Sequence, residues 1–235
     1  GQKDNAIPRE AEALVLASKE EGEKLSAYAA AYTEALRKEY TGSDEGITIT
    51  IEGEGEGTEP VLHPVSQEKV LFFLLNYPNG IQKMCGFIEG LVETSCNVGI
   101  TKLTPAALSC SASVRSSVGT AKKALADKIA YLTEFLGGTF TIEGEYPAWE
   151  FKQDSKLRQV LVDVYQEMYE KEPVVNVIHA GLECGLFYEK IAELDCVSIG
   201  PDMQDIHTSE EKLSISSVER VCLLYTSPSP RDTER

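Results

Sequence analysis

The sequences LVETSCNVGI at residues 91–100 and ALSCSASVR at residues 107–115 decide the fold that we expect for the first part of the chain. Side chains alternate between the two faces of a strand. The even-numbered residues of both segments therefore form an apolar face, and Arg115 lies among serines on the opposite face. Two such segments joined by a short connection predict an antiparallel pair with one buried face.

Amphipathic helices surround this pair. Apolar residues recur at spacings of three and four after residue 18, after Ser66, which we expect to cap the second helix, and before Gly137, a natural helix end. Residues 70–75 of the second helix should supply a buried stripe. Residues 11–17, 47–51 and 139–145 are predicted to be further strands. Residues 1–145 should therefore form an α+β layer, an antiparallel sheet with helices on one face.

The pattern changes at Tyr146. A strongly amphipathic stretch over residues 154–172 predicts a helix, and the apolar runs at 174–179 and 196–201 predict buried strands that enclose another helix. Helices alternating with buried strands indicate a parallel sheet in an α/β domain. Residues 222–235 end in Ser-Pro-Ser-Pro-Arg and offer no core pattern, so we expect a non-native or disordered tail there.

Composition narrows the classes of function. The chain has 42% hydrophobic and 26% charged residues and a formal net charge of −16. Such a field repels a phosphate backbone, which excludes nucleic acid as a partner. No apolar run approaches the roughly 20 residues of a membrane span. The six cysteines form no C-x-x-C pair, which predicts reduced thiols and a cytoplasmic location.

Three histidines are candidates for chemistry, and the residues alone leave their roles open. His63 lies in a connection, where a surface or packing role is the simpler interpretation. His179 ends a predicted strand and is either a core histidine or a catalytic one. His207 lies in a polar loop after a buried strand, where no apolar neighbour requires an imidazole, and it is a candidate metal ligand.

Four motifs together resemble one family. Residues 5–10 (NAIPRE), the PNG at 78–80 followed by VETSCNVGI, residues 178–187 (IHAGLECGLF), and residues 197–220 (VSIGPDMQDIHTSEEKLSISSVER) resemble the bacterial cytosolic non-specific dipeptidases. These aminoacyl-histidine dipeptidases belong to the aminoacylase/carboxypeptidase G family of di-zinc metallopeptidases. The resemblance covers nearly all of residues 1–221.

The resemblance implies a lid and dimerisation domain over residues 1–145, followed by an incomplete α/β catalytic-domain segment over residues 146–221. It also implies roles for single residues. His207 matches a zinc ligand, and Arg115 matches the lid arginine that binds the substrate's terminal carboxylate, a task suited to a guanidinium fork. Asn5 matches a lid asparagine that hydrogen-bonds substrate, and Gly181 matches a position whose backbone lies beside the substrate.

The same resemblance shows what this sequence lacks. The family's H-x-D motif, bridging aspartate and paired glutamates, which include the general base, lie upstream of the lid and have no counterpart here. One imidazole cannot hold a pair of zinc ions, so we expect the natural protein to begin upstream and this chain to be inactive alone. The parent would be a homodimeric hydrolase of unblocked dipeptides. The alternative is a non-catalytic dimerisation or interaction module derived from the peptidase lid.

Overall fold

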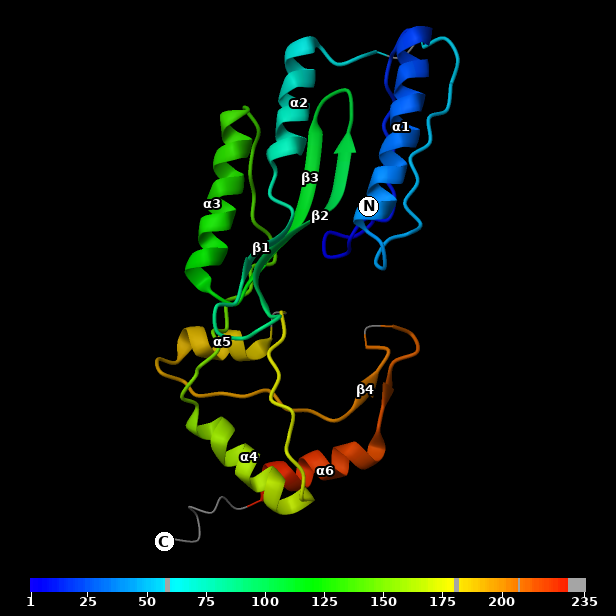
Figure 1. The fold of residues 1–235 in the computed structure, drawn as a ribbon. Coiled ribbons are helices and arrows are strands. Elements are labelled where there is room, and N and C mark those ends of the chain that lie inside the picture. Colours follow the sequence, from blue (N-terminus) through cyan, green and yellow to red (C-terminus); the bar gives the residue numbers. More distant parts are fainter. Residues whose placement is uncertain (58–59, 180–181, 207, 228–235) are drawn as a thin grey trace.

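The computed structural model describes residues 1–57, 60–179, 182–206 and 208–227. Figure 1 shows two groups of elements. One group contains three helices and a sheet, namely α1 (Lys19–Glu39), α2 (Pro64–Asn76), β1 (Gly80–Met84), β2 (Val92–Leu103), β3 (Leu108–Ser116) and α3 (Gly119–Phe135). The other contains α4 (Lys156–Tyr169), α5 (Glu183–Lys190), β4 (Met203–Gln204), β5 (Lys212–Leu213) and α6 (Ile215–Thr226).

The three longer strands form an antiparallel sheet in the order β1-β2-β3. The pair β2 and β3 confirms the two strands predicted from residues 91–100 and 107–115. Cys96 lies opposite Val114, and Ser95 lies opposite Arg115, so neighbouring pairs face opposite sides of the sheet. The register shifts between Val98 and Ile100, and strand β1 was not predicted.

The core of this layer lies between the sheet and α3. Cys96 and Ile129 are 1% and 2% exposed, and they cluster with Leu125. Partly buried residues complete the cluster: Tyr77, Ala112, Val114 and Phe140. Burial, followed by the effect of Cys110, raises the pKa of Cys96 to about 11, so this side chain is a protonated thiol at neutral pH. The prediction of an apolar sheet face covered by a helix is confirmed.

Helix α1 begins where its sequence provides a capping box. The Ser18 hydroxyl accepts a hydrogen bond from the Glu21 amide, and the Glu21 carboxylate accepts one from the Ser18 amide at 2.8 Å. Helix α2 begins differently from the prediction. His63, not Ser66, is its N-cap, and the ring Nδ1 accepts a hydrogen bond from the Val65 amide at 3.3 Å. An imidazole nitrogen thus takes the role usually played by a hydroxyl.

The buried stripe expected on the second helix is wrong. None of the residues of α2 is buried, and Leu75 is 82% exposed. Other exposed apolar residues of this helix are Val65, Leu71, Phe72 and Leu74. The period of three and four fixed the helix but not the surface against which it packs.

Three predicted strands in this first part are also wrong. Residues 11–17, 47–51 and 139–145 have no strand assignment. The segment 47–51 lies along α1 instead: Arg37 donates a hydrogen bond to the carbonyl of Ile47, and the Ile49 amide donates one to the Thr33 hydroxyl. Alternation supplies a half-buried face, but a strand also needs a neighbouring backbone for its ladder.

The second part holds a larger departure. The helices α4 and α5 confirm the predictions for residues 154–172 and for the segment after Gly181, but residues 174–179 and 196–201 form no strands. The sheet described here is instead the short antiparallel pair β4 and β5. The parallel sheet expected for an α/β segment is therefore absent from the described residues, because these apolar runs meet no parallel neighbour.

Helix α6 continues past the expected end of the ordered chain. It includes Cys222 and ends at Thr226, so the tail predicted for residues 222–235 begins inside a helix. Residues 228–235 lie outside the described part. Within that part, we find no helix with the length and apolar character that crossing a membrane requires.

The segment that joins the two parts, residues 136–155 between α3 and α4, packs closely against both. The Lys122 ammonium on α3 donates to the carbonyl of Tyr146 and pairs with Glu145 at 3.3 Å. On the other side, a β-carbon added to Gly185 of α5 would lie 2.8 Å from the carbonyl oxygen of Pro147. Trp149 lies beside the same glycine.

Candidate functional site

The site is built on the polar face of the sheet. Ser95 on β2 lies opposite Arg115 on β3, and Asn97 lies opposite Ser113. These four side chains share the face turned away from Cys96 and α3 because side chains alternate along each strand. The Arg115 side chain is exposed to solvent. Within the described part of the chain it forms no ion pair, so its positive charge is available to an anion.

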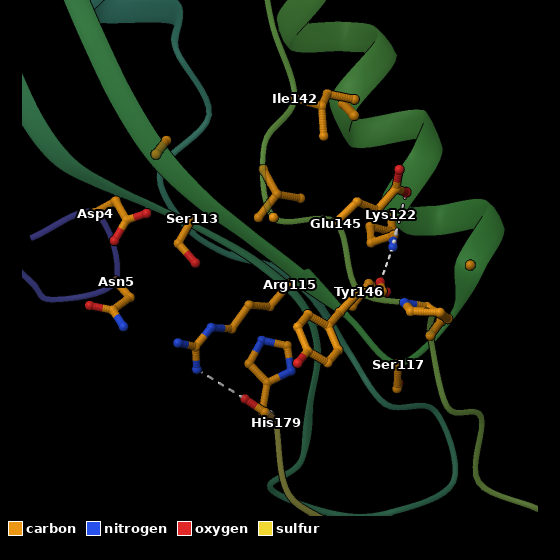
Figure 2. Close-up of a pocket in the computed structure, with 18 of the residues that line it drawn as sticks. Asp4, Asn5, Ser113, Arg115, Ser117, Lys122, Ile142, Glu145, Tyr146 and His179 are labelled. Carbon is orange, nitrogen blue, oxygen red and sulfur yellow. Dashed lines mark hydrogen bonds and ion pairs between the residues drawn. The ribbon is translucent and has the colours of Figure 1, made fainter. Parts of the chain in front are cut away.

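His179 contacts the paired positions Ser95 and Arg115, and Figure 2 shows it beside the arginine. Its ring Nε2 lies 2.7 Å from the Ser95 hydroxyl oxygen, and its backbone carbonyl accepts a hydrogen bond from Arg115 Nη1 at 3.3 Å. Burial, and then the nearby Arg115 charge, lowers the pKa of His179. Both effects disfavour an imidazolium, so the ring is neutral at neutral pH.

The N-terminal segment lies against the same face. The Asn97 side-chain amide donates hydrogen bonds to the carbonyls of Asp4 and Ala6, at 2.7 Å and 3.0 Å. A β-carbon on Gly99 would overlap the backbone of Lys3 and Asp4, so the close approach of this segment requires glycine. Asn5 stands between the two bonded carbonyls, and its own side chain is exposed.

Several of these residues line one large open cavity of about 2790 Å³ between the two parts of the molecule. Asn5, Arg115 and His179 contribute to its wall, and Tyr146 and Lys122 line it near the joining segment (Figure 2). A guanidinium and an amide side chain facing one space can bind a carboxylate and a neighbouring peptide group. The arrangement therefore suits a small ligand with a free carboxylate.

The predicted site residues divide into two pairs. Asn5 and Arg115, 110 positions apart in the sequence, line the same cavity. Gly181 and His207 lie outside the described residues, so their predicted roles stay predictions. Among the described residues, no group of three or more histidine, cysteine, aspartate or glutamate side chains is placed to hold a metal ion.

Ser95 and Asn97 were not predicted as site residues. Alternation along residues 91–100 placed both on the polar face, but their importance depends on which residue of β3 lies opposite each of them. Alternation puts Glu93 on the same polar face, where a solvent-exposed carboxylate would be expected. Glu93 is 6% exposed and pairs with Lys83 of β1 at 2.8 Å, a contact that required knowledge of the unpredicted strand.

Comparison with known proteins defines the class. Residues 11–227 match the sequence model of peptidase family M20/M25/M40. This match covers most of the chain, and the chain belongs to that family.

Two relatives place it more narrowly. The chain is 30% identical over 222 residues to the cytosol non-specific dipeptidase of Escherichia coli. The matched region covers 94% of this chain and 46% of that protein. It is also 30% identical to the aminoacylhistidine dipeptidase of Vibrio alginolyticus, whose crystal structure matches with a TM-score of 0.77 over 89% of this chain and 44% of that one. The chain thus spans less than half the length of either relative.

A more distant structure shares the fold alone. The aminopeptidase PepT of Bacillus cereus matches with a TM-score of 0.51 at 16% identity, over 68% of this chain and 43% of that one. The resemblance to a dipeptidase of this peptidase family, expected from four motifs, is confirmed.

Proposed function

We propose that this chain supplies the carboxylate-binding part of a metallo-dipeptidase that hydrolyses unblocked dipeptides. The observation that carries the proposal is the meeting of Asn5 and Arg115 at one cavity. Arg115 uses one N–H for the His179 carbonyl, which leaves the other donors of its guanidinium for a ligand carboxylate. Asn5 supplies an amide that can bond a peptide group nearby, and both relatives are dipeptidases by name.

The metal part of this proposal rests on His207 and on the family. When bound, two zinc ions would polarise the scissile carbonyl and activate a water molecule. The described residues do not fit such a pair, because no three or more of their histidine, cysteine, aspartate or glutamate side chains are placed together to hold a metal ion. We propose that the 235-residue chain is inactive alone. Zinc-dependent dipeptide hydrolysis by the purified chain would contradict this.

Binding tests the carboxylate assignment without requiring catalysis. Dipeptide titration into the ¹⁵N-labelled chain should perturb the amides of β3 near Arg115, and the same dipeptide with a C-terminal amide should bind more weakly. Arg115→Ala should raise Kd roughly 10- to 100-fold, since a hydrogen bond to a charged group contributes about 1.5–3 kcal/mol. Lys128→Ala, which removes one exposed positive charge from α3, is the matched control. Equal affinity for the acid and the amide would refute the assignment.

A cytoplasmic location belongs to the same proposal. The cysteines are free in the structure, and several of them are half-buried. The Escherichia coli relative is named a cytosol enzyme. Free thiols are typical of proteins kept in a reducing compartment.

The second candidate is a dimerisation or interaction module without chemistry. Its support is the exposed apolar surface of α2, where Leu71, Phe72 and Leu74 are each 45–47% exposed. Several exposed apolar side chains on one helix favour a partner, and a second copy of the chain is the partner that we propose. Light scattering after gel filtration tests this: Leu75→Glu with Phe72→Glu should convert a dimer into a monomer, and a native monomer would remove the candidate.

A further inference from the structure

Residue 179 is joined to two positions that are themselves direct partners in the sheet. Its imidazole bonds Ser95 on β2, and its carbonyl accepts from Arg115 on β3. Ser95 and Arg115 lie opposite each other in the antiparallel register. One residue from a distant segment therefore closes a ring of contacts that includes a serine hydroxyl, a backbone carbonyl and a guanidinium.

We propose that His179 is a positioning residue that latches the Arg115 guanidinium through Ser95 and so sets the direction in which Arg115 presents its free donors. The consequence for ligand binding rests on the proposed function, since it assumes that Arg115 binds a carboxylate. The His179–Ser95–Arg115 latch itself is a property of this chain and can be tested without any ligand.

The two hydrogen bonds of residue 179 explain how the latch acts. The hydrogen bond at Nη1 restrains the guanidinium, and the remaining N–H groups stay free for a ligand in the cavity that Arg115 lines. The carbonyl that holds it belongs to residue 179, whose place depends on the bond between its ring and Ser95. Loss of the Ser95 hydroxyl frees the ring, then the carbonyl, and finally the guanidinium.

Charge supports the same arrangement. Arg115 on β3 is the charged group that affects His179, and within the described residues no carboxylate forms an ion pair with the ring. A neutral ring can approach the guanidinium without repulsion, whereas an imidazolium would oppose it. The half-buried position of His179 maintains that neutral state.

The latch also connects two parts of the chain. His179 directly precedes the segment that leads into α5, and α5 packs against the joining segment at Gly185. Arg115 belongs to the sheet. Residue 179 therefore joins the strands β2 and β3 to the part of the chain that follows Tyr146.

The first experiment measures the latch directly by NMR of the full 235-residue chain. Rotation of the Arg115 guanidinium about its Nε–Cζ bond should be slow in the native chain. It should be about fivefold faster in Ser95→Ala, as expected for one lost hydrogen bond of about 1 kcal/mol. Ser95→Thr keeps a hydroxyl and should restore the native rate. Ser111→Ala, which removes a hydroxyl further along the same face of β3, is the control.

The second experiment measures the consequence for binding. Ser95→Ala should weaken binding of a free dipeptide about fivefold and leave the weaker binding of its C-terminal amide unchanged. An unchanged guanidinium rotation in Ser95→Ala overturns the latch, while the Arg115→Ala result still decides the proposed function. If the native chain binds acid and amide equally, the proposed function fails, and the rotation measurement decides the latch alone.

Discussion

The sheet layer and the region after Tyr146 differ in how their apolar segments are used. In the sheet layer, β2 pairs along both edges, and Cys96 and Ile129 are nearly inaccessible. Among the described residues of the second region, Val164 is the buried hydrophobic side chain. The apolar runs at 174–179 and 196–201 form no strands there. An apolar run thus becomes a strand only where a partner backbone lies beside it.

The largest expected effect is on stability, and it compares a buried side chain of the sheet layer with a buried side chain of the second region. Ile129→Ala should lower the free energy of unfolding of the sheet layer by about 2–5 kcal/mol, whereas Val164→Ala should cost the second region about 1–2 kcal/mol. Hydrogen exchange of β2 and α4 amides separates the two effects. Tyr131→Ala, at a residue 72% exposed on the same helix as Ile129, is the control. Equal losses at Ile129 and Val164 would remove the distinction.

The next effect concerns charge within the sheet. Lys83→Met leaves the nearly buried Glu93 carboxylate without its ammonium partner. Because Lys83 is itself 60% exposed, the cost should be moderate, about 1–3 kcal/mol. Chemical denaturation measures it, and the exposed Lys128→Met is the control. Recovery of stability in the double variant Lys83→Met with Glu93→Gln would show that the loss comes from the unpaired carboxylate, and failure to recover would contradict this.

A smaller effect concerns the start of α4. The Ser155 hydroxyl accepts from the Arg158 amide at 3.0 Å and donates to the Asp195 carboxylate at 2.6 Å. Ser155→Ala removes both bonds and should destabilise the second region by about 1 kcal/mol, as loss of an N-cap does. Exchange of the first-turn amides of α4 should increase while that of β2 stays unchanged. A global change in both regions would mean that the two unfold as one unit.

The smallest effect is a dependence on pH. Burial alone would raise the pKa of Asp195, but hydrogen bonds from the Leu157 amide and Ser155, with the charge of Lys152, lower it. Its folded pKa lies below its unfolded value, so its contribution to stability is present above the unfolded pKa and is lost as the pH falls through the folded one.

The lowered pKa of His179 changes stability with pH in the same direction, so this contribution is also lost as the pH falls. The unfolded chain takes up this proton first, so acidification below the ordinary histidine range should weaken the contact with Ser95. NMR titration of His179 and of the Leu157 amide follows the two groups separately. A His179 pKa above its ordinary value would contradict the neutral ring.

Much of the fold followed from local pattern. Ser18 with Glu21, Ser155, and the glycine after α3 mark helix ends through contacts within a few residues. The alternation in residues 91–100 and 107–115 gave the apolar sheet face and placed Arg115 on the other. These features depend on the chain near them, and local sequence specifies them.

The remaining features depend on distant partners. Strand β1 is exposed along its whole length, so no alternation of apolar residues reveals it. Likewise, Ser95 matters because Arg115 lies opposite and His179 bonds its hydroxyl, a combination set by three separate segments. Arg115 and Asn5 were found through resemblance to a family, and the structure adds that they share a cavity, without testing what they bind.

The two hydrogen bonds from Asn97 have a consequence for the thermodynamics of binding. They hold the carbonyls on both sides of Asn5, so the backbone at this position is ordered when the chain folds rather than when a ligand arrives. The conformational entropy of the N-terminal segment is then lost once, in folding, and is not subtracted again from affinity. A side chain carried on such a segment can favour one ligand orientation with a single amide group.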